Sequence, residues 1–526
     1  MDAVRTLRLA LLAATTVTAA LLTSPAAAAP LDQSAGLGFD LDSATIPDLQ
    51  QRMDHGRLSS VQLTSAYLSR IRSVDPKIHS VIALNQRATS EAAASDLRRS
   101  GHHTLSPLDG IPVLLKDNVD TRSMPTTAGS RALTRTRPAA DAHLVDQLRR
   151  GGAVILGKVN LSEWANFRST HSTSGWSGVG GQTNNPYVLD RNPCGSSSGS
   201  GAAVAASLAQ VAIGTETDGS IVCPSGINDI VGHKPTLGLV SRAGVVPISA
   251  EQDTAGPMTR HVIDSAITLS VIQGRDAADP ATGAIPSTQP RDYARLLRPD
   301  ALRGARIGIW RLSGADADVD RVVNDAVATL RARGATTVDV DLPFQDAVNQ
   351  NEFPALMTEF RRDLNNYLAA RPGGPDTLAE LIEFNKNDPV ELSKFGQEIF
   401  ELSEAAPRPN DPVYLEQRRV ATTSAKRSID ETMARFHLDA IMAPTNSPAW
   451  KTDYAAGDAF ILGSSTPAAV AGYPNVQVPA GFAGPLPIGV SFFAGRWQDA
   501  TVLAFAAAFE RAQPARRVPQ FIPTIG

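Results

Sequence analysis

Two serine-rich stretches carry the residue types that nucleophilic hydrolysis needs. The first, NPCGSSSGSGAAVAA at residues 192–206, sets four serines among glycines and runs into a small-residue helix. The second, GTETDGSIVCPS at residues 214–225, follows the apolar segment QVAI. A serine hydroxyl becomes a nucleophile when a base takes its proton and when N–H groups stabilise the oxyanion that forms. These two stretches are therefore the first candidates for a reaction centre.

The first stretch contains GSSSG, which matches the G-x-S-x-G pattern with Ser197 at its centre. In that pattern the serine stands on a turn between a strand and a helix, and a histidine follows late in the chain. Here the preceding NNPYVLDRNPC has two prolines and is typical of a loop, and the last histidine, His437, ends a predicted surface helix. We interpret Ser197 as a chance match. The patterns of phosphate and dinucleotide loops are also missing from this stretch, so no cofactor is expected.

A lysine ends the apolar segment GIPVLLKDN, where burial of an ammonium group without a partner is costly. One interpretation is that Lys116 reaches solvent or pairs with Asp117. The other is a neutral lysine that acts as a general base, with its pKa lowered by burial.

The second serine stretch can form a tight turn over Thr217, Asp218, Gly219 and Ser220. Several backbone N–H groups would then face one way and could hold an oxyanion beside the Ser220 hydroxyl. The alternative is an ordinary turn that ends a strand, and the spacing does not separate the two.

The elements around these residues alternate between strands and helices, which predicts an α/β protein with one large sheet covered by helices. The candidate residues then lie at strand ends inside the core, where a flexible linker would be misplaced. Two helices are expected within residues 46–71, and a mainly helical insertion over 352–436. The predicted strands are 111–116, 153–160, 211–217, 305–311, 438–445, 475–482 and 488–495. Residues 317–342 are expected to form a helix followed by a strand, and a helix closes the chain at 500–512.

The N-terminus has the three-part pattern of a secretory signal. Arg5 and Arg8 precede an apolar run from residue 9 to 22, and small residues follow up to Ala28. We expect cleavage near Ala28 and secretion, a loose segment over 29–44, and a single domain over 45–515. The net charge of −4, without a dense basic run, argues against nucleic acid and a membrane surface as partners.

The cysteine and histidine content indicates neither a zinc site nor a disulfide framework. A chain of 526 residues can bury a large core without a covalent staple, so we expect Cys194 and Cys223 to be buried free thiols. The nine histidines are scattered, and no metal site is predicted.

Taken together, the lysine segment and both serine stretches resemble the amidase signature family. Five further segments agree with the family in order: TTAGS, GKVNLSEWA, GHKPTLGLVSR, DTAGPMTR, and the tail from AGYPNVQVPAGF onward. The resemblance covers most of residues 45–512 and is weakest over 300–436. Within the family the chain is most similar to the peptide amidases, through SEWANFRS, CGSSSGSG and TETDGSIVCPS. The implied fold is a large mixed sheet covered by helices, with 300–436 as a mainly helical insertion that shapes the substrate pocket.

The resemblance implies a Ser-Ser-Lys triad. The family's lysine falls on Lys116, its bridging serine, which follows a cis peptide bond, on Ser196, and its nucleophile on Ser220. The oxyanion would be held by the backbone N–H groups of Thr217, Asp218, Gly219 and Ser220. The family loop usually reads G-G-S-S-G-G-S, and the nucleophile element G-S-D-T-G-G-S. Asp218 therefore stands where glycine is usual.

These implications add up to an expected secreted serine amidase that converts C-terminal peptide amides to acid and ammonia. A small-molecule or aryl-amide hydrolase of the same family is the alternative. Two more alternatives are an inactive binding protein and one subunit of a tRNA-dependent amidotransferase. The retained triad argues against the first of these, and the export signal argues against the second.

Overall fold

One mixed sheet of eleven strands forms the centre of the computed structural model, which describes residues 37–525. The spatial order is β1-β3-β2-β6-β8-β7-β12-β13-β11-β9-β10, and a separate pair is made by β4 and β5. The strands are β1 (Val81–Leu84), β2 (Pro112–Lys116), β3 (Val154–Val159), β4 (Trp176–Ser177), β5 (Gly181–Gln182), β6 (Val211–Glu216), β7 (Val231–Lys234), β8 (Thr254–Thr259), β9 (Arg306–Ile309), β10 (Thr336–Asp339), β11 (Ala440–Pro444), β12 (Asn475–Ala483) and β13 (Leu486–Phe493).

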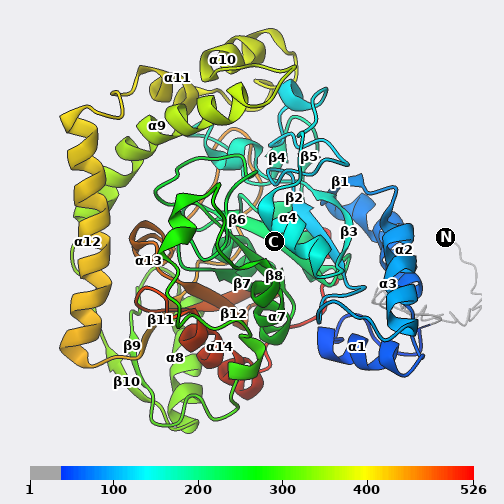
Figure 1. Cartoon of the computed structure of the whole chain (residues 1–526). Coiled ribbons are helices and arrows are strands. Elements are labelled where there is room, and N and C mark those ends of the chain that lie inside the picture. The colour runs from blue at the N-terminus through cyan, green and yellow to red at the C-terminus, as the bar shows by residue number, and fades with distance from the viewer. Residues whose placement is uncertain (1–36, 526) are drawn as a thin grey trace, which may run out of the picture.

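Helices cover this sheet and form an outer layer beside it (Figure 1). They are α1 (Ile46–Asp54), α2 (Ser60–Ile78), α3 (Ala88–Ser100), α4 (His143–Arg150), α5 (Ser198–Ala205), α6 (Val222–Ile227), α7 (Val262–Ile272), α8 (Ala317–Ala332), α9 (Gln345–Ala369), α10 (Leu378–Asn387), α11 (Glu398–Ala405), α12 (Pro412–Phe436), α13 (Thr466–Ala471) and α14 (Asp499–Ala512). Helices α5, α6, α7, α8 and α14 pack on strands, whereas α9 packs on α10, α11 and α12. The predicted large mixed sheet covered by helices is confirmed.

The middle of the sheet is buried on both faces, which explains its unbroken apolar sequence. Every residue of β2, β3 and β6 is buried, and β2 runs parallel to both neighbours. Parallel strands covered on both faces read as continuous apolar runs rather than as alternating patterns. Close packing also explains Gly157 in β3, because a Cβ there would stand 2.2 Å from the Ala83 carbonyl oxygen of β1.

Residues 300–436 divide into two parts. The first part adds β9 and β10 to the edge of the main sheet, with β9 parallel to β10 and β11, and α8 packs on β12 and β13. The second part, α9–α12, forms the outer layer at the left and top of Figure 1. The mainly helical insertion therefore starts at α9, and the residues before it belong to the central α/β layer.

The predicted signal segment, residues 1–28, lies outside the described residues. Of the segment 29–44, expected to be loose, the described part from residue 37 packs against the core, because Leu41 and Ala44 are buried. Asp42 also lies 3.4 Å from the guanidinium of Arg70 in α2. Over the described range 37–525, no helix is both long and apolar enough to cross a membrane.

Candidate active site

Lys116 ends β2 in the middle of the sheet and is fully buried. Its Nζ donates to the hydroxyl oxygens of Ser196 at 2.7 Å, Ser197 at 3.0 Å and Thr215 at 2.9 Å. Burial lowers the pKa of Lys116 to about 7, against the opposing effect of the negative charges of Asp253 and Glu216. A lysine with that pKa is partly neutral near pH 7 and can then accept a proton.

The structure answers whether Lys116 reaches solvent or pairs with Asp117, because it does neither. The Asp117 carboxylate accepts a hydrogen bond from Lys158 Nζ at 3.2 Å and bonds from the backbone and hydroxyl of Thr127. Lys158 also donates to the carbonyl oxygen of Val119 at 2.6 Å. The second buried lysine thus neutralises the aspartate, which leaves Lys116 among hydroxyl groups.

Ser196 and Ser197 lie in the loop before α5, and both are fully buried. The peptide bond between Gly195 and Ser196 is cis, and the Ser196 carbonyl accepts a hydrogen bond from the Ser162 N–H at 3.0 Å. Glycine is required at 195, because a Cβ there would stand 2.2 Å from Ser162 Oγ. The Ser197 hydroxyl donates to the Thr215 carbonyl at 3.1 Å and accepts from the Thr215 N–H at 3.2 Å. Ser197 is thus occupied in tying the loop to β6, as a chance G-x-S-x-G match would allow.

Ser220 stands in the turn between β6 and α6, with 9% of its surface exposed. Among residues 37–525 its hydroxyl has no hydrogen-bond partner, and its carbonyl accepts from the Ser197 N–H at 3.2 Å. Glu216 Oε2 accepts from the N–H groups of Ile221 at 2.8 Å and Val222 at 3.0 Å, which fixes the first turn of α6. The structure therefore brings Lys116 into contact with Ser196 directly and joins Ser220 to that loop through its backbone.

The turn over Thr217, Asp218, Gly219 and Ser220 presents free backbone donors. Within the described part of the chain, none of these four N–H groups donates to a protein acceptor. Gly219 has φ +76°, a left-handed conformation that glycine adopts at little cost. Unpaired donors gathered in one turn favour an anion-binding arrangement over an ordinary strand-ending turn.

The Asp218 side chain contacts α13. Its Oδ2 accepts a hydrogen bond from Thr466 Oγ1 at 2.6 Å, and burial raises the pKa of this carboxyl. Asp253 accepts from the Thr217 hydroxyl and from the N–H groups of Ile248 and Ser249, and burial raises its pKa to about 6. Two carboxyls thus hold the turn, Asp218 through Thr466 and Asp253 through the Thr217 hydroxyl.

Cys194 and Cys223 form a disulfide, with Cα atoms 6.1 Å apart, so the expectation of free thiols is wrong. We expected free thiols because a large core is stable without a disulfide. The bridge instead joins the loop that contains Cys194 and Gly195 to the first turn of α6, which contains Cys223. Core size has no bearing on a link of that kind.

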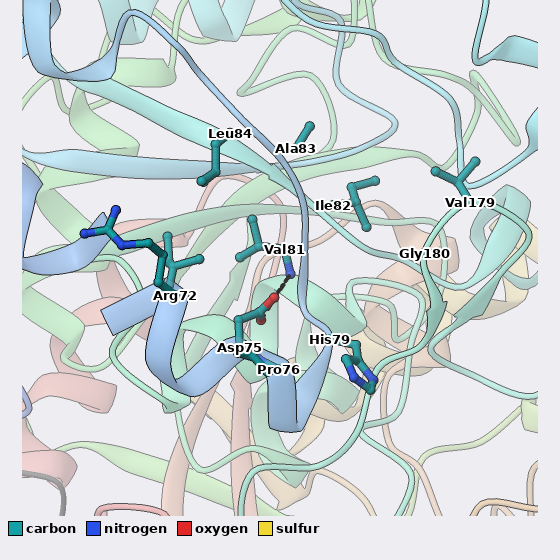
Figure 2. A pocket seen from close by; sticks show the side chains of 11 residues that line it. Arg72, Asp75, Pro76, His79, Val81, Ile82, Ala83, Leu84, Val179 and Gly180 are labelled. Atoms are coloured by element: carbon teal, nitrogen blue, oxygen red, sulfur yellow. Dashed lines mark hydrogen bonds between the residues drawn. The ribbon is translucent and has the colours of Figure 1, made fainter. Parts of the chain in front are cut away.

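Among the described residues there is neither a metal centre nor a second site in the hollow of Figure 2. In the range 37–525, no group of three or more His, Cys, Asp or Glu side chains is placed to hold a metal ion. Figure 2 shows a hollow of about 460 Å³ between the end of α2 and β1, lined in part by Asp75 and His79. The Asp75 carboxylate already accepts from the N–H groups of Ser80 and Val81, and none of the predicted site residues lines the hollow.

Thr215 and Lys158 belong to this site but escaped the sequence interpretation. Thr215 holds Lys116 from 99 positions along the chain, and its Oγ1 also accepts from Asn118 Nδ2 at 2.9 Å. The sequence held two hints of these contacts. Asn118 lies two positions after Lys116, and Lys158 is a lysine within an apolar strand, as Lys116 is. A pairing between distant segments cannot be read from either segment alone.

The family model described as Amidase matches residues 62–503. A probable amidase of Arabidopsis thaliana is 38% identical over 92% of this chain and 93% of its own. One of the subunits of the glutamyl-tRNA(Gln) amidotransferase of Geobacter metallireducens is 35% identical over 90% of this chain and 97% of its own. The solved structure of native peptide amidase from Stenotrophomonas maltophilia has a TM-score of 0.87 and 46% identity, covering 91% of this chain and 99% of its own.

Replacing Lys116 by methionine is expected to change how stability depends on pH. The pKa of this lysine falls from 10.5 to about 7 on folding, so between these values the unfolded chain holds more protons. As pH rises from 7 to 10, the Lys116 titration therefore raises the free energy of unfolding of the wild type, with a slope of up to about 1.4 kcal/mol per pH unit. The Lys116→Met variant lacks this contribution.

Urea unfolding of both proteins at pH 7, 8 and 9 measures the difference. The free energy of unfolding of the wild type should rise with pH relative to that of the variant. Parallel pH dependences would mean that the buried lysine stays charged, and would contradict the lowered pKa.

Proposed function

The chain belongs to the amidase family and hydrolyses amide C–N bonds, and we propose that its substrates are C-terminal peptide amides. The products would be the free peptide acid and ammonia. Support for this substrate class comes from the 46% identity to a peptide amidase over almost the whole of that chain. The amidotransferase relative is also similar over nearly its full length. The alternative functions therefore differ in the substrate, and not in the fold.

The observation that carries the mechanism is the hydrogen bond from buried Lys116 to Ser196. Ser220 is joined to the same loop through its carbonyl, which accepts from the Ser197 N–H, and its hydroxyl has no hydrogen-bond partner within residues 37–525. In the proposed first step, neutral Lys116 takes the Ser196 proton while Ser196 takes that of Ser220. The relay requires the Ser220 hydroxyl to donate to Ser196 Oγ once substrate is bound, and such contacts often tighten on binding. Ser220 Oγ then attacks the amide carbon.

The developing oxyanion would be held by the backbone N–H groups of residues 217–220, which face no protein acceptor in the described chain. The proton held by Lys116 returns through Ser196 to the amide nitrogen as the C–N bond breaks, and ammonia leaves. Water, deprotonated by the same relay, then attacks the acyl ester on Ser220 and releases the acid. Every step uses side chains and backbone groups of this chain.

Replacing Ser220 by alanine is expected to lower the release of ammonia from a peptide amide by at least about 10³-fold, because it removes the nucleophile. Ser197→Ala is the matched control, since this neighbouring serine also contacts Lys116 but forms no covalent bond in the proposed mechanism. Its turnover should stay well above that of Ser220→Ala.

A lower turnover in Ser197→Ala than in Ser220→Ala would make Ser197 the nucleophile and contradict the assignment.

The wild type should be tested on peptide amides and on acyl anilides. Cleavage of anilides without ammonia from any peptide amide would contradict the proposed substrate class and favour the aryl-amide alternative.

We also propose that the mature enzyme is secreted. The charged and apolar pattern up to Ala28 supports export, and the Cys194–Cys223 disulfide suits an oxidising compartment. N-terminal sequencing of protein recovered from the medium of a secreting host should begin close to Ala29. Protein that stays inside the cell and still begins with Met1 would contradict secretion.

A further inference from the structure

We propose that the Cys194–Cys223 disulfide is a positioning element of the active site, which holds the Ser196 loop against the Ser220 turn. Turnover then depends on the oxidised state of this bridge. The inference rests on the proposed roles of Ser196 and Ser220, and it assigns to the bridge a part in catalysis beyond holding the fold together.

The bridge joins the two segments that carry the two serines. Cys194 lies two positions before Ser196, and Cys223 lies three positions after Ser220. The two cysteines are 29 positions apart, and their Cα atoms are 6.1 Å apart. A change in the distance between the two cysteines would therefore also change the distance between the hydroxyl groups of Ser196 and Ser220, because only two or three residues separate each serine from its cysteine.

The non-covalent links between the same two segments are individual hydrogen bonds, among them the two between the Ser197 hydroxyl and the backbone of Thr215. The Ser197 N–H donates to the Ser220 carbonyl at 3.2 Å, and Asn228 Nδ2 donates to the Pro193 carbonyl at 2.8 Å. Each is a single hydrogen bond with a modest net contribution to stability. By contrast, Lys116 holds Ser196 from the β2 side and makes no hydrogen bond to Ser220 among the described residues. Within residues 37–525 the Cys194–Cys223 bridge is the only covalent cross-link between these two segments.

The backbone at Cys194 shows what the bridge restrains. Cys194 has φ +56°, in the left-handed region that residues other than glycine adopt infrequently. Its N–H donates to Asn192 Oδ1 at 2.8 Å, and its carbonyl accepts from Ser198 Oγ at 2.7 Å. Glycine adopts this conformation freely, whereas a residue with a Cβ, such as cysteine, does not. With cysteine, loss of the bridge would let the loop relax toward commoner φ values and move Ser196.

The test is a kinetic comparison of the double variant Cys194→Ala/Cys223→Ala with the wild type on a peptide amide. Because a displacement of about 1 Å can cost up to 10²-fold in rate, kcat should fall by about 10- to 100-fold. KM should change little, because both cysteines are buried and neither takes part in the proposed chemical steps. Circular dichroism must show that the variant is folded at the assay temperature.

Leu330→Ala is the matched control for lost stability. Leu330 is fully buried in α8, which packs on β10–β13 at the other end of the sheet, so its truncation should destabilise the fold through a cavity. Its kcat should stay at the wild-type value. Unchanged kcat in the cysteine variant would overturn the proposal, and so would an equal fall in kcat in Leu330→Ala.

If the double variant does not fold, reduction of the wild type gives the same test. A water-soluble phosphine breaks the S–S bond and takes an oxygen atom from water, leaving a phosphine oxide and two cysteine thiols. Enzyme in which two thiols are titrated should have lost turnover, and oxidised glutathione should restore it by forming the bridge again. Full turnover with two free thiols would overturn the proposal. A wild type without any amidase activity would instead contradict the proposed function.

Discussion

The burial of Lys116 at the end of a central strand is the constraint on which the site depends. An ammonium group removed from water without a counter-ion is costly, so burial favours the neutral form and lowers the pKa to about 7. The structure keeps that effect in place by pairing the adjacent Asp117 with Lys158 instead. Hydroxyl groups of Ser196, Ser197 and Thr215 then satisfy the amine without supplying a negative charge.

The remaining architecture brings two distant loops to this amine. Strand β6 lies beside β2, so the turn that follows β6 places Ser220 next to the loop that carries Ser196. Glu216 fixes the first turn of α6, and the Cys194–Cys223 bridge joins that turn covalently to the Ser196 loop. The result is a base and two serine hydroxyls in one region of the molecule. Within residues 37–525 the Ser220 hydroxyl and the backbone N–H groups of its turn have no protein partner.

Much of the fold followed from pattern, because long apolar strands and amphipathic helices leave strong periodic signals. The strand ending at Lys116 is one example, and the two helices predicted within residues 46–71 are another, although α2 continues to Ile78. Short elements such as β7 and α6 were not separated from the loops around them. The disulfide and the contact of Lys116 with Thr215 also escaped, because both join segments far apart in sequence and depend on how the strands pair. Of the site, the candidate residues could be named from sequence and resemblance, whereas their mutual geometry needed the fold.

Lys116 is expected to be partly neutral in the folded enzyme near pH 7, and its protonation can be measured directly. Nuclear magnetic resonance of protein with isotope-labelled lysine side chains follows each amine as pH changes, and Lys116→Met identifies the signal by its loss. The account predicts a titration midpoint for Lys116 close to pH 7, more than three pH units below the ordinary value of 10.5. A midpoint near 10 would show a permanently charged ammonium group and would contradict its role as a base.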